Sequence, residues 1–376
     1  MRRVCYISGA RADFGLMRST LQRLRDTPGL VLSVLATGMH LSRDYGHTVD
    51  EIAAAGLTVT TRISVPLEPA TGATMARNIG TMLGGFVDAF ETERPDVVLL
   101  LGDRGEMLAG ALAAIHLNIP VAHIHGGERS GTVDEPVRHA VSKLAHLHFT
   151  ATAGARARLI RMGEAPGRIH VTGAPGLDGL DEGPRPPRTE LMRSHGLDPT
   201  RPLALLVYHP VLQEADRGAA STEVLLSQLQ AHGCQVLALT PNSDAGGEAI
   251  RAILKAADGS PGLSLRAHLP RPEFLGAMAA ADIIVGNSSA GIIEAASFGA
   301  PVLNVGSRQA GRERNANVTD VACTRAEVRR GIQRLLAHGR YEQANIYGDG
   351  HAGERITSLL AQTPLDVALL MKINRY

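Results

Sequence analysis

An uninterrupted aliphatic run, Val97–Leu101, leads directly into residues 102–106, Gly-Asp-Arg-Gly-Glu, and this junction constrains the fold more than any other segment. Five consecutive apolar residues, two of them β-branched, predict a strand that is buried on both faces of a parallel sheet. The two glycines allow the backbone to turn tightly past the strand end. Because ligands bind beyond the carboxyl ends of strands in open α/β sheets, the charged side chains of this turn indicate an active site.

Short apolar strands alternate with helical patterns along the whole chain, which predicts doubly wound parallel sheets. The predicted strands are residues 4–7, 31–35, 58–63, 97–101, 121–124, 147–150 and 169–171, then 203–208, 235–239, 263–265, 283–285 and 302–305. The predicted helices are residues 14–24, 75–91, 107–116 and 137–144, then 223–231, 248–257, 272–279 and 292–298. We therefore expect an α/β fold with two Rossmann-like doubly wound domains that face a cleft.

The length of 376 residues exceeds one ordinary core and favours two domains. A proline-rich piece at residues 183–188 is typical of a linker between domains. We expect an N-terminal domain over residues 1–182 that carries the catalytic acids, a C-terminal domain over residues 183–350 that binds the nucleotide, and a helical tail over residues 351–376 that crosses back onto the first domain.

The composition excludes several classes of function. A net charge of +1 argues against broad binding to nucleic acid or to acidic membranes, and 3% aromatic residues leave no obvious stacking platform for single-stranded nucleic acid. The three cysteines lie far apart and form no Cys-x-x-Cys pair, which fits a reducing compartment. Neither a signal peptide nor a membrane span is expected, so we expect a soluble cytoplasmic protein, and the cysteine spacing argues against a thiolate metal site.

Three segments of the first half carry candidate chemistry. Residues 8–15 follow the first predicted strand and place Arg11 in a glycine-containing turn that suits a phosphate, although a plain helix start would look the same. Asp103 and Arg104 stand at the end of the aliphatic strand. Residues 123–139 contain a His-x-His pair, in which zinc binding is a minor alternative, and the acid/base candidates Glu128 and Asp134. Asp134 could instead cap a helix.

Polar groups also follow the strands predicted in the second half. We expect these strand ends to hold an anionic ligand, because hydroxyls and backbone N–H groups at a helix start bind anions. The candidates are His209, Asn242, Ser288, Ser289, Glu294 and Arg308. Glu294 could accept from ribose hydroxyls or simply pair with a neighbouring side chain.

These motifs together resemble the hydrolysing UDP-N-acetylglucosamine 2-epimerases of sialic and legionaminic acid synthesis. The resemblance covers nearly the whole chain, and its most specific parts are residues 102–104, residues 130–134 with residues 138–139, and residues 286–289. It implies a GT-B-like fold, no metal or nicotinamide, a nucleotide-sugar substrate, and a homodimer or dimer of dimers. It also implies elimination of UDP to a glycal and rehydration to the free manno-configured sugar.

By motif, the resemblance assigns UDP binding to Arg11, Arg104, His209, Asn242, Ser288, Ser289, Glu294 and Arg308. It assigns catalysis to Asp103 and Asp134, with His209 placed to compensate charge on the departing phosphate. Many family members carry glutamate where this chain has His125, so either His125 or Glu128 must take that catalytic role, and we expect His125 to do so.

Other functions remain open at the level of sequence. They are a non-hydrolysing epimerase that keeps UDP on the product, a GT-B glycosyltransferase, and a nucleotide-sugar sensor without turnover. The sugar is also open between N-acetylglucosamine and a 2,4-diacetamido-2,4,6-trideoxy sugar. His268 lies where some relatives bind a downstream activated sugar as a regulator.

Overall fold

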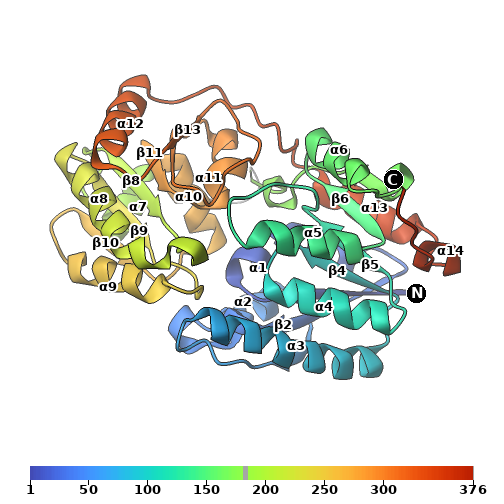
Figure 1. The fold of residues 1–376 in the computed structure, drawn as a ribbon. Helices are drawn as coiled ribbons and strands as arrows, with labels where there is room; N and C mark the ends of the chain where they lie inside the picture. The colour runs from blue at the N-terminus through green and yellow to red at the C-terminus, as the bar shows by residue number, and fades with distance from the viewer. Residues whose placement is uncertain (181–184, 376) are drawn as a thin grey trace.

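Two fully parallel sheets organise the chain, one in each half (Figure 1), in a computed structural model that describes residues 1–180 and 185–375. The first sheet has seven strands in the order β3-β2-β1-β4-β5-β6-β7, and the second has six in the order β10-β9-β8-β11-β12-β13. The prediction of two Rossmann-like doubly wound domains is confirmed. The expected boundary at residues 182 and 183, with the first part of the linker, lies outside the described residues.

The first domain alternates strands with helices. Its strands are β1 (Arg2–Ser8), β2 (Leu30–Thr37), β3 (Val59–Ile63), β4 (Val97–Leu101), β5 (Val121–Ile124), β6 (Leu147–Thr150) and β7 (Ile169–Val171). Its helices are α1 (Arg11–Asp26), α2 (Val49–Ala54), α3 (Gly72–Glu93), α4 (Gly105–His116), α5 (Asp134–Leu144) and α6 (Ala153–Arg161).

The second domain repeats this plan. Its strands are β8 (Leu203–Val207), β9 (Gln235–Leu239), β10 (Leu263–Arg266), β11 (Ile283–Gly286), β12 (Val302–Val305) and β13 (Val318–Val321). Its helices are α7 (Arg188–Ser194), α8 (Gly218–Ala231), α9 (Gly247–Ala257), α10 (Arg271–Ala280), α11 (Ser289–Ile293) and α12 (Arg325–His338). Two further helices, α13 (Ala352–Gln362) and α14 (Val367–Leu370), end the chain.

Strand β4 is aliphatic throughout because both faces of the sheet are covered. It lies between β1 and β5, and all five of its residues are buried. Val97 and Leu99 belong to one apolar cluster, whereas Val98 and Leu100 belong to another on the opposite face. This alternation follows from the two-residue period of a strand. Each such side chain contributes roughly 1.5–3 kcal/mol by leaving water, so β4 is a rigid base for the turn that follows it.

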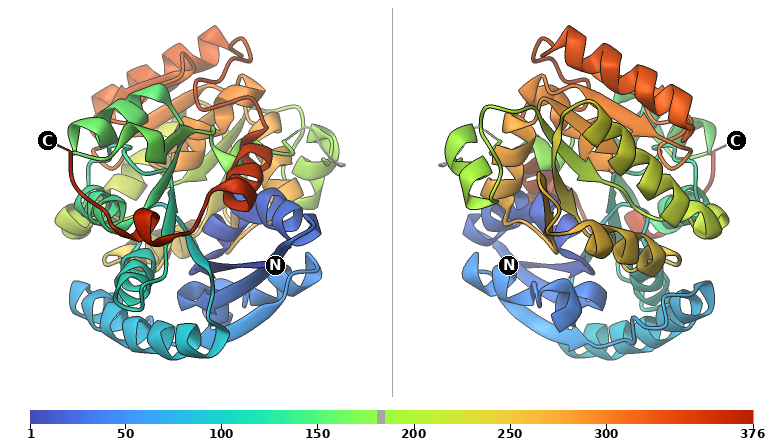
Figure 2. Two further views of the ribbon diagram at one scale, coloured as in Figure 1. Left: turned by 90° about the vertical axis from the view of Figure 1, so that its right-hand side faces the viewer. Right: turned by 90° about the vertical axis from the view of Figure 1, so that its left-hand side faces the viewer.

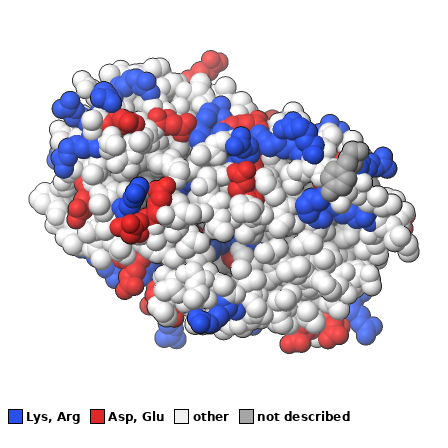
Figure 3. Space-filling model, in the orientation of Figure 1, with Lys and Arg blue, Asp and Glu red and all other residues white. Residues whose placement is uncertain are grey.

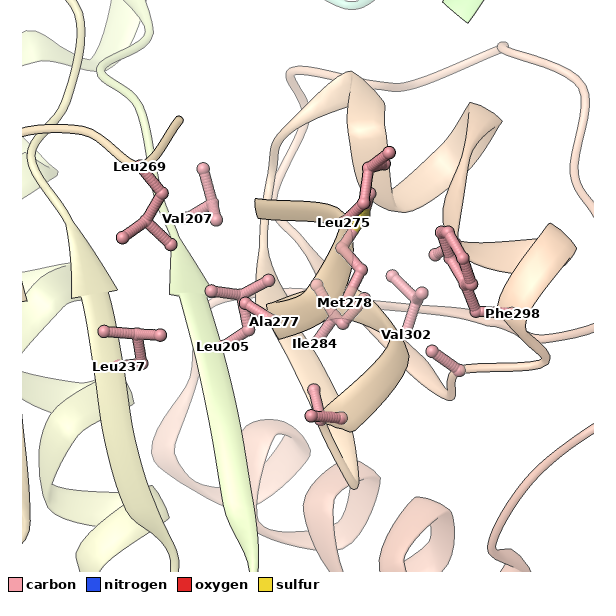
Figure 4. Close-up of a cluster of buried hydrophobic side chains, with 14 of the residues drawn as sticks. Leu205, Val207, Leu237, Leu269, Leu275, Ala277, Met278, Ile284, Phe298 and Val302 are labelled. Atoms are coloured by element: carbon pink, nitrogen blue, oxygen red, sulfur yellow. The ribbon is translucent and has the colours of Figure 1, made fainter. Parts of the chain in front are cut away.

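The second domain has its own core. Figure 4 shows Leu205 and Val207 of β8 beside Leu237 of β9, facing Met278 of α10. A second cluster covers the other face of the same sheet. The strand ends of this domain are therefore held as firmly as those of the first.

Several elements differ from expectation. The edge strand β13 was not predicted, because it reads Val-Thr-Asp-Val and is only half-buried, so no apolar run marks it. The helices α2, α6, α7 and α12 were not among the predicted ones either. The single helix predicted over residues 292–298 is in fact α11 followed by a 3-10 turn, Ala295–Phe298.

The last part of the chain returns to the first domain, where α13 packs against α1 (Figures 1 and 2). The carboxylate of Asp178 accepts the backbone N–H groups of Ala352 and Gly353 at the start of α13. The polypeptide thus crosses between the domains twice. Among the described residues, no helix has both the length and the apolar character that crossing a bilayer requires.

Candidate active site

The carboxyl ends of both sheets face one cleft, which contains a cavity of about 240 Å³ lined by both domains. In each sheet the strand order reverses between two neighbours, β1 and β4 in the first and β8 and β11 in the second. The loops that leave a sheet at such a reversal run in opposite directions and open a crevice. The cavity therefore lies where two of these crevices face each other.

The turn after β1 supplies one cavity-lining cation and one structural acid. Arg11 lines the cavity and reaches across to donate to the backbone carbonyl of Leu269 in the second domain. Asp13 is buried and accepts from the hydroxyl of Ser8 and from the backbone N–H groups of residues 9 and 10. The helix-start interpretation thus holds for Asp13, while Arg11 faces the cleft.

The turn after β4 places Asp103 against a buried guanidinium. Gly102 has φ of +82°, a backbone conformation that favours glycine, and it lets the chain reverse at the strand end. Asp103 forms an ion pair with Arg138, which is 1% exposed. Burial lowers the pKa of Arg138 well below its ordinary value, and the charges of Arg312 and Arg308 lower it further. A negatively charged ligand in this cavity would relieve that repulsion.

Arg104 joins the two domains. Its guanidinium contacts Glu106 at 2.8 Å and Asp244 of the second domain at 3.3 Å. The negative charge of Glu106 raises the pKa of Arg104 well above its ordinary value, outweighing burial. Burial raises the pKa of Asp244, but the charge of Arg104 outweighs it, so that carboxyl titrates below its usual range. Arg104 and Asp244 therefore stay ionised, and their contact holds Arg104 in the cavity wall.

The two histidines after β5 differ in role. His123 is fully buried, contacts the hydroxyl of Ser142 at 3.1 Å and the carbonyl of Gly102 at 2.7 Å, and so supports the turn that carries Asp103. His125 lies just past the strand with φ of +63°, which is rare outside glycine, and lines the cavity. The two rings therefore have different surroundings, because His123 lies within β5 whereas His125 follows it with a positive φ.

His125 contacts a carboxylate instead of a second histidine. Its Nδ1 lies against Glu128, which is 3% exposed and does not line the cavity. Among the residues that the structure describes, no three histidine, cysteine or acidic side chains come together as a metal site would require. The structure thus brings His125 to the cleft and places Glu128 behind it.

Asp134 begins α5 and lines the same cavity. Its carboxylate lies 3.8 Å from the guanidinium of Arg308, which comes from the second domain. The residue at the cap position is Val133, and the side chain of Asp134 makes no capping hydrogen bond. The capping alternative is therefore wrong, and Asp134 instead faces a cation across the cleft.

The turn after β8 presents an uncharged imidazole. Asn287 holds the backbone of His209 through its side-chain amide, accepting at 2.7 Å and donating at 2.8 Å. The Nδ1 of His209 accepts the backbone N–H of Asn242, which leaves Nε2 to carry the proton. Burial and the charge of Arg308 lower the pKa of His209 to about 3. His209 therefore offers a neutral N–H donor to the cleft. A neutral N–H can stabilise a nearby negative charge only as a hydrogen-bond dipole and not as a positive charge.

The remaining candidates extend the cleft into an adjoining cavity of about 140 Å³. Ser288 and Ser289 at the start of α11 line both cavities, and Arg308 follows β12 and lines the larger one. Glu294 lines the smaller cavity and contacts Arg271 at 2.5 Å. It therefore pairs with a neighbouring side chain and also faces the smaller cavity.

Several cleft residues escaped sequence reasoning. Arg271 and Arg312 lie outside the candidate motifs, and no role was predicted for Arg138 or Asp244, which lie within them. Arg138 lies four residues after Asp134 on the same helix face, a spacing that could have pointed to it. The other three sit in loops or at a helix start, where no periodicity marks them. His268, expected near a regulatory site, lines the main cavity itself.

Comparison with known proteins identifies the family. The sequence model of the family described as UDP-N-acetylglucosamine 2-epimerase matches residues 22–361. The chain belongs to this family. It is 48% identical, over the full length of both chains, to the UDP-N,N'-diacetylbacillosamine 2-epimerase (hydrolyzing) of Legionella pneumophila. It is 31% identical to the GDP/UDP-N,N'-diacetylbacillosamine 2-epimerase (hydrolyzing) of Campylobacter jejuni, over 85% of this chain and 84% of that one.

A solved member of the family has the same fold. The crystal structure of UDP-GlcNAc 2-epimerase from Neisseria meningitidis bound to UDP-GlcNAc superposes with a TM-score of 0.80, at 18% identity, over 96% of this chain and all of that one. The GT-B-like arrangement that the sequence predicted is therefore confirmed.

Proposed function

We propose that this chain is a hydrolysing 2-epimerase that converts a UDP-2-acetamido sugar into UDP and the free manno-configured sugar. The observation that carries the proposal is the single cleft in which acids of the first domain face anion-binding groups of the second. The name of the 48% identical Legionella protein supports the hydrolysing reaction and a diacetamido sugar.

We place the diphosphate at the end of the cleft where hydrogen-bond donors and positive charges gather. Strand ends of both domains offer cations, hydroxyls and a neutral imidazole to the same space. We assign UDP binding to Arg11, Arg104, His209, Asn242, Ser288, Ser289, Glu294 and Arg308. Fixed donors at a leaving phosphate stabilise charge as it develops, and each contributes on the order of 10²–10³ in rate.

The first chemical stage is elimination. A base removes the proton from C2, the electron pair of that C–H bond forms the C1–C2 double bond, and the bond from C1 to the β-phosphate oxygen breaks to release UDP. We assign proton transfer at C2 to Asp103 and His125, which line the cavity and contact Arg138 and Glu128 respectively. Inversion at C2 needs one group to take the proton and another to return it on the opposite face.

The second stage is hydration. Water oxygen bonds to C1, a proton returns to C2, and the water loses its own proton to a base. We assign that base to Asp134, because it lies beside Arg308 and hence at the diphosphate end, where C1 must be. Glu128, which the sequence left as an alternative to His125, is set behind the histidine and takes no direct part.

A smaller cavity beyond Arg104 supports a deoxygenated, acetylated sugar. It measures about 70 Å³, shares Met39 and Arg104 with the main cavity, and includes Leu67, Met75 and Met82 in its lining. In a hexose ring C4 and C6 lie across from C1 and C2. When C1 faces the diphosphate and C2 faces the acids, C4 and C6 therefore point toward the opposite wall. The apolar side chains of this cavity suit a 6-methyl group, and its polar lining, which includes Asn78 and Ser243, suits a 4-acetamido group.

A panel of nucleotide sugars tests the function. Pure protein is incubated with UDP-N-acetylglucosamine and with the UDP-2,4-diacetamido-2,4,6-trideoxy sugar of gluco configuration, and free UDP and sugar are separated by chromatography. The proposal predicts equimolar UDP and free manno-configured sugar. A product that keeps UDP would indicate a non-hydrolysing epimerase, turnover only with an added acceptor would indicate a glycosyltransferase, and binding without turnover would indicate a sensor.

The substrate assignment has its own test. Met75→Gln keeps the length of the side chain but puts an amide in the small cavity, so kcat/KM for the diacetamido substrate should fall about tenfold, with little change for UDP-N-acetylglucosamine. Met371→Gln, at a side chain that is 66% exposed, is the matched control. Equal loss for both substrates would show that the cavity does not contact C4 or C6.

A homodimer remains our expectation for the partner. Figure 3 shows charged groups scattered in small clusters of mixed sign and a broad uncharged surface over α4. Helix α4 carries the half-buried side chains of Leu108 and Ile115, and a broad uncharged surface is typical of an interface. Light scattering of the purified protein should give twice the chain mass, and a monomer at micromolar concentration would refute this. We also propose the cytoplasm as the compartment, which the three free cysteines fit.

A further inference from the structure

His125 is held by a chain of charges that ends in the other domain. Its Nδ1 contacts one oxygen of Glu128, and the other oxygen of Glu128 lies 2.9 Å from the guanidinium of Arg312. Arg312 follows β12 and belongs to the second domain, and its side chain is 8% exposed. Burial raises the pKa of Glu128, but the charges of His125 and Arg312 outweigh it and bring the pKa to about 2. Glu128 is therefore a carboxylate throughout the physiological range.

An ionised Glu128 fixes the tautomer of His125. A carboxylate only accepts hydrogen bonds, so Nδ1 must carry a proton and the lone pair of the neutral ring is on Nε2. Among the described residues, Nε2 has no hydrogen-bond partner, while the ring lines the cavity. The backbone is fixed too, because the N–H of His125 donates to the carbonyl of Phe149 at 3.0 Å.

The contact through Arg312 is part of a larger seam between the domains. We name residues 307–313 the clasp loop and residues 125–134 the acid loop. The N–H of Gly131 donates to the carbonyl of Arg308 at 3.0 Å, so the two loops share a backbone hydrogen bond. Glu313 of the clasp loop accepts from Thr152 at 2.8 Å and from Arg158 at 3.0 Å. Arg158 in turn donates to the carbonyl of Gly127 in the acid loop.

We infer that Glu128 and Arg312 are positioning residues that complete the acid–base group His125 only when the clasp loop closes on the acid loop. Separation of the domains removes Arg312 from Glu128 and leaves a buried carboxylate without its second partner, an arrangement that favours rearrangement of the acid loop. The enzyme thus assembles its proton-transfer group at the moment the cleft excludes water. This inference rests on the proposed function, in which His125 transfers the proton at C2.

The role predicts a specific kinetic pattern. Glu128→Gln and Arg312→Met should each lower kcat at least tenfold while KM for the nucleotide sugar changes less than threefold, because neither residue is among the groups to which we assign UDP binding. The kcat of the double variant should lie within about twofold of the kcat of the slower single variant, because the two residues act as one unit. Arg312→Lys, which keeps the charge, should recover part of the rate.

Controls separate this idea from general damage and from failure of the proposed function. Arg329→Met removes an exposed arginine of α12, outside both loops, and should change kcat less than twofold. Melting curves identify variants that fail to fold. If Glu128→Gln or Arg312→Met fails to fold, Glu128→Asp or Arg312→Lys is measured in its place. Wild-type protein that turns over no nucleotide sugar would overturn the function itself. Active wild type with unchanged single variants, or with effects that multiply in the double variant, would overturn the inference.

Discussion

The substitution Gly131→Ala tests whether closure of the two domains is required for catalysis, because it adds one methyl group and no charge. A Cβ at residue 131 would lie 1.7 Å from the carbonyl oxygen of Ser307 and 2.8 Å from its carbonyl carbon. No real Cβ approaches backbone oxygen so closely, and Ser307 is backbone of the opposite domain. The clasp loop therefore has to retreat from the acid loop by roughly 1.5 Å before ordinary van der Waals contact is restored.

The retreat of the clasp loop should lower the catalytic rate strongly while changing the melting temperature little. It breaks the hydrogen bond from Gly131 to Arg308 and draws Arg308, to which we assign UDP binding, away from the acids. A misplacement of about 1 Å costs on the order of 10²-fold in rate, which is about 2.7 kcal/mol of transition-state stabilisation. The apolar clusters of both domains do not include residue 131, so each domain should keep its melting temperature within a few degrees.

The assay is UDP release under saturating and subsaturating nucleotide sugar, with a melting curve for each variant. Gly167→Ala is the matched control, because a Cβ there would meet nothing within 4 Å. We expect kcat/KM of Gly131→Ala to fall about a hundredfold and that of Gly167→Ala to stay within twofold. Wild-type activity in Gly131→Ala would refute the argument that this closed contact is needed for turnover.

Three further predictions follow from the site. Asp103→Asn should abolish UDP release, with a loss of at least 10²-fold, because it removes a proton-transfer group and leaves Arg138 without its counter-charge; UDP release above a tenth of the wild-type rate would contradict this. Asp134→Asn should still release UDP but let the unhydrated glycal accumulate, which mass spectrometry detects as a product 18 Da below the free sugar; an unchanged product ratio would refute the assignment. Burial lowers the pKa of His123 to about 3, against about 6.5 in an unfolded chain, so the unfolded state binds more protons between these values. The stabilising contribution of the neutral His123 is complete above pH 6.5 and is lost as the pH falls toward 3. The side chain of the His123→Gln variant does not titrate. The melting temperature of this variant should therefore fall less between pH 7.5 and 5 than that of the wild type.

Much of the fold was predictable because the informative segments are buried on both sides. Strands such as β4 must be continuously apolar when helices cover both faces, and this leaves a strong signal. The edge strand β13 has a single neighbour, β12, and is half-buried, so its sequence is mixed and no run announces it. Helix boundaries extended beyond the predicted ones by one to five residues, as at Gly218–Ala231, because capping turns carry polar residues that periodicity ignores.

In the candidate site, the residues that directly follow strands were predictable from the sequence, whereas the contacts between the two domains were not. Asp103, His209 and Ser288 stand immediately after strands, where the topology dictates that ligands bind. Pairings across the cleft were not predictable, because Arg312 meets Glu128 only through the docking of two loops that are far apart in sequence. The positive φ of His125 likewise depends on tertiary structure and left no signal in the sequence.

Turnover in deuterated water tests the central claim most directly, namely that acids of one domain and diphosphate-binding groups of the other act on one sugar. The account predicts one UDP for each free manno-configured sugar, with one deuterium at C2 of every product molecule, because the proton removed in elimination exchanges with solvent before the opposite face is protonated. Product that retains the original hydrogen at C2, or that remains attached to UDP, would contradict it.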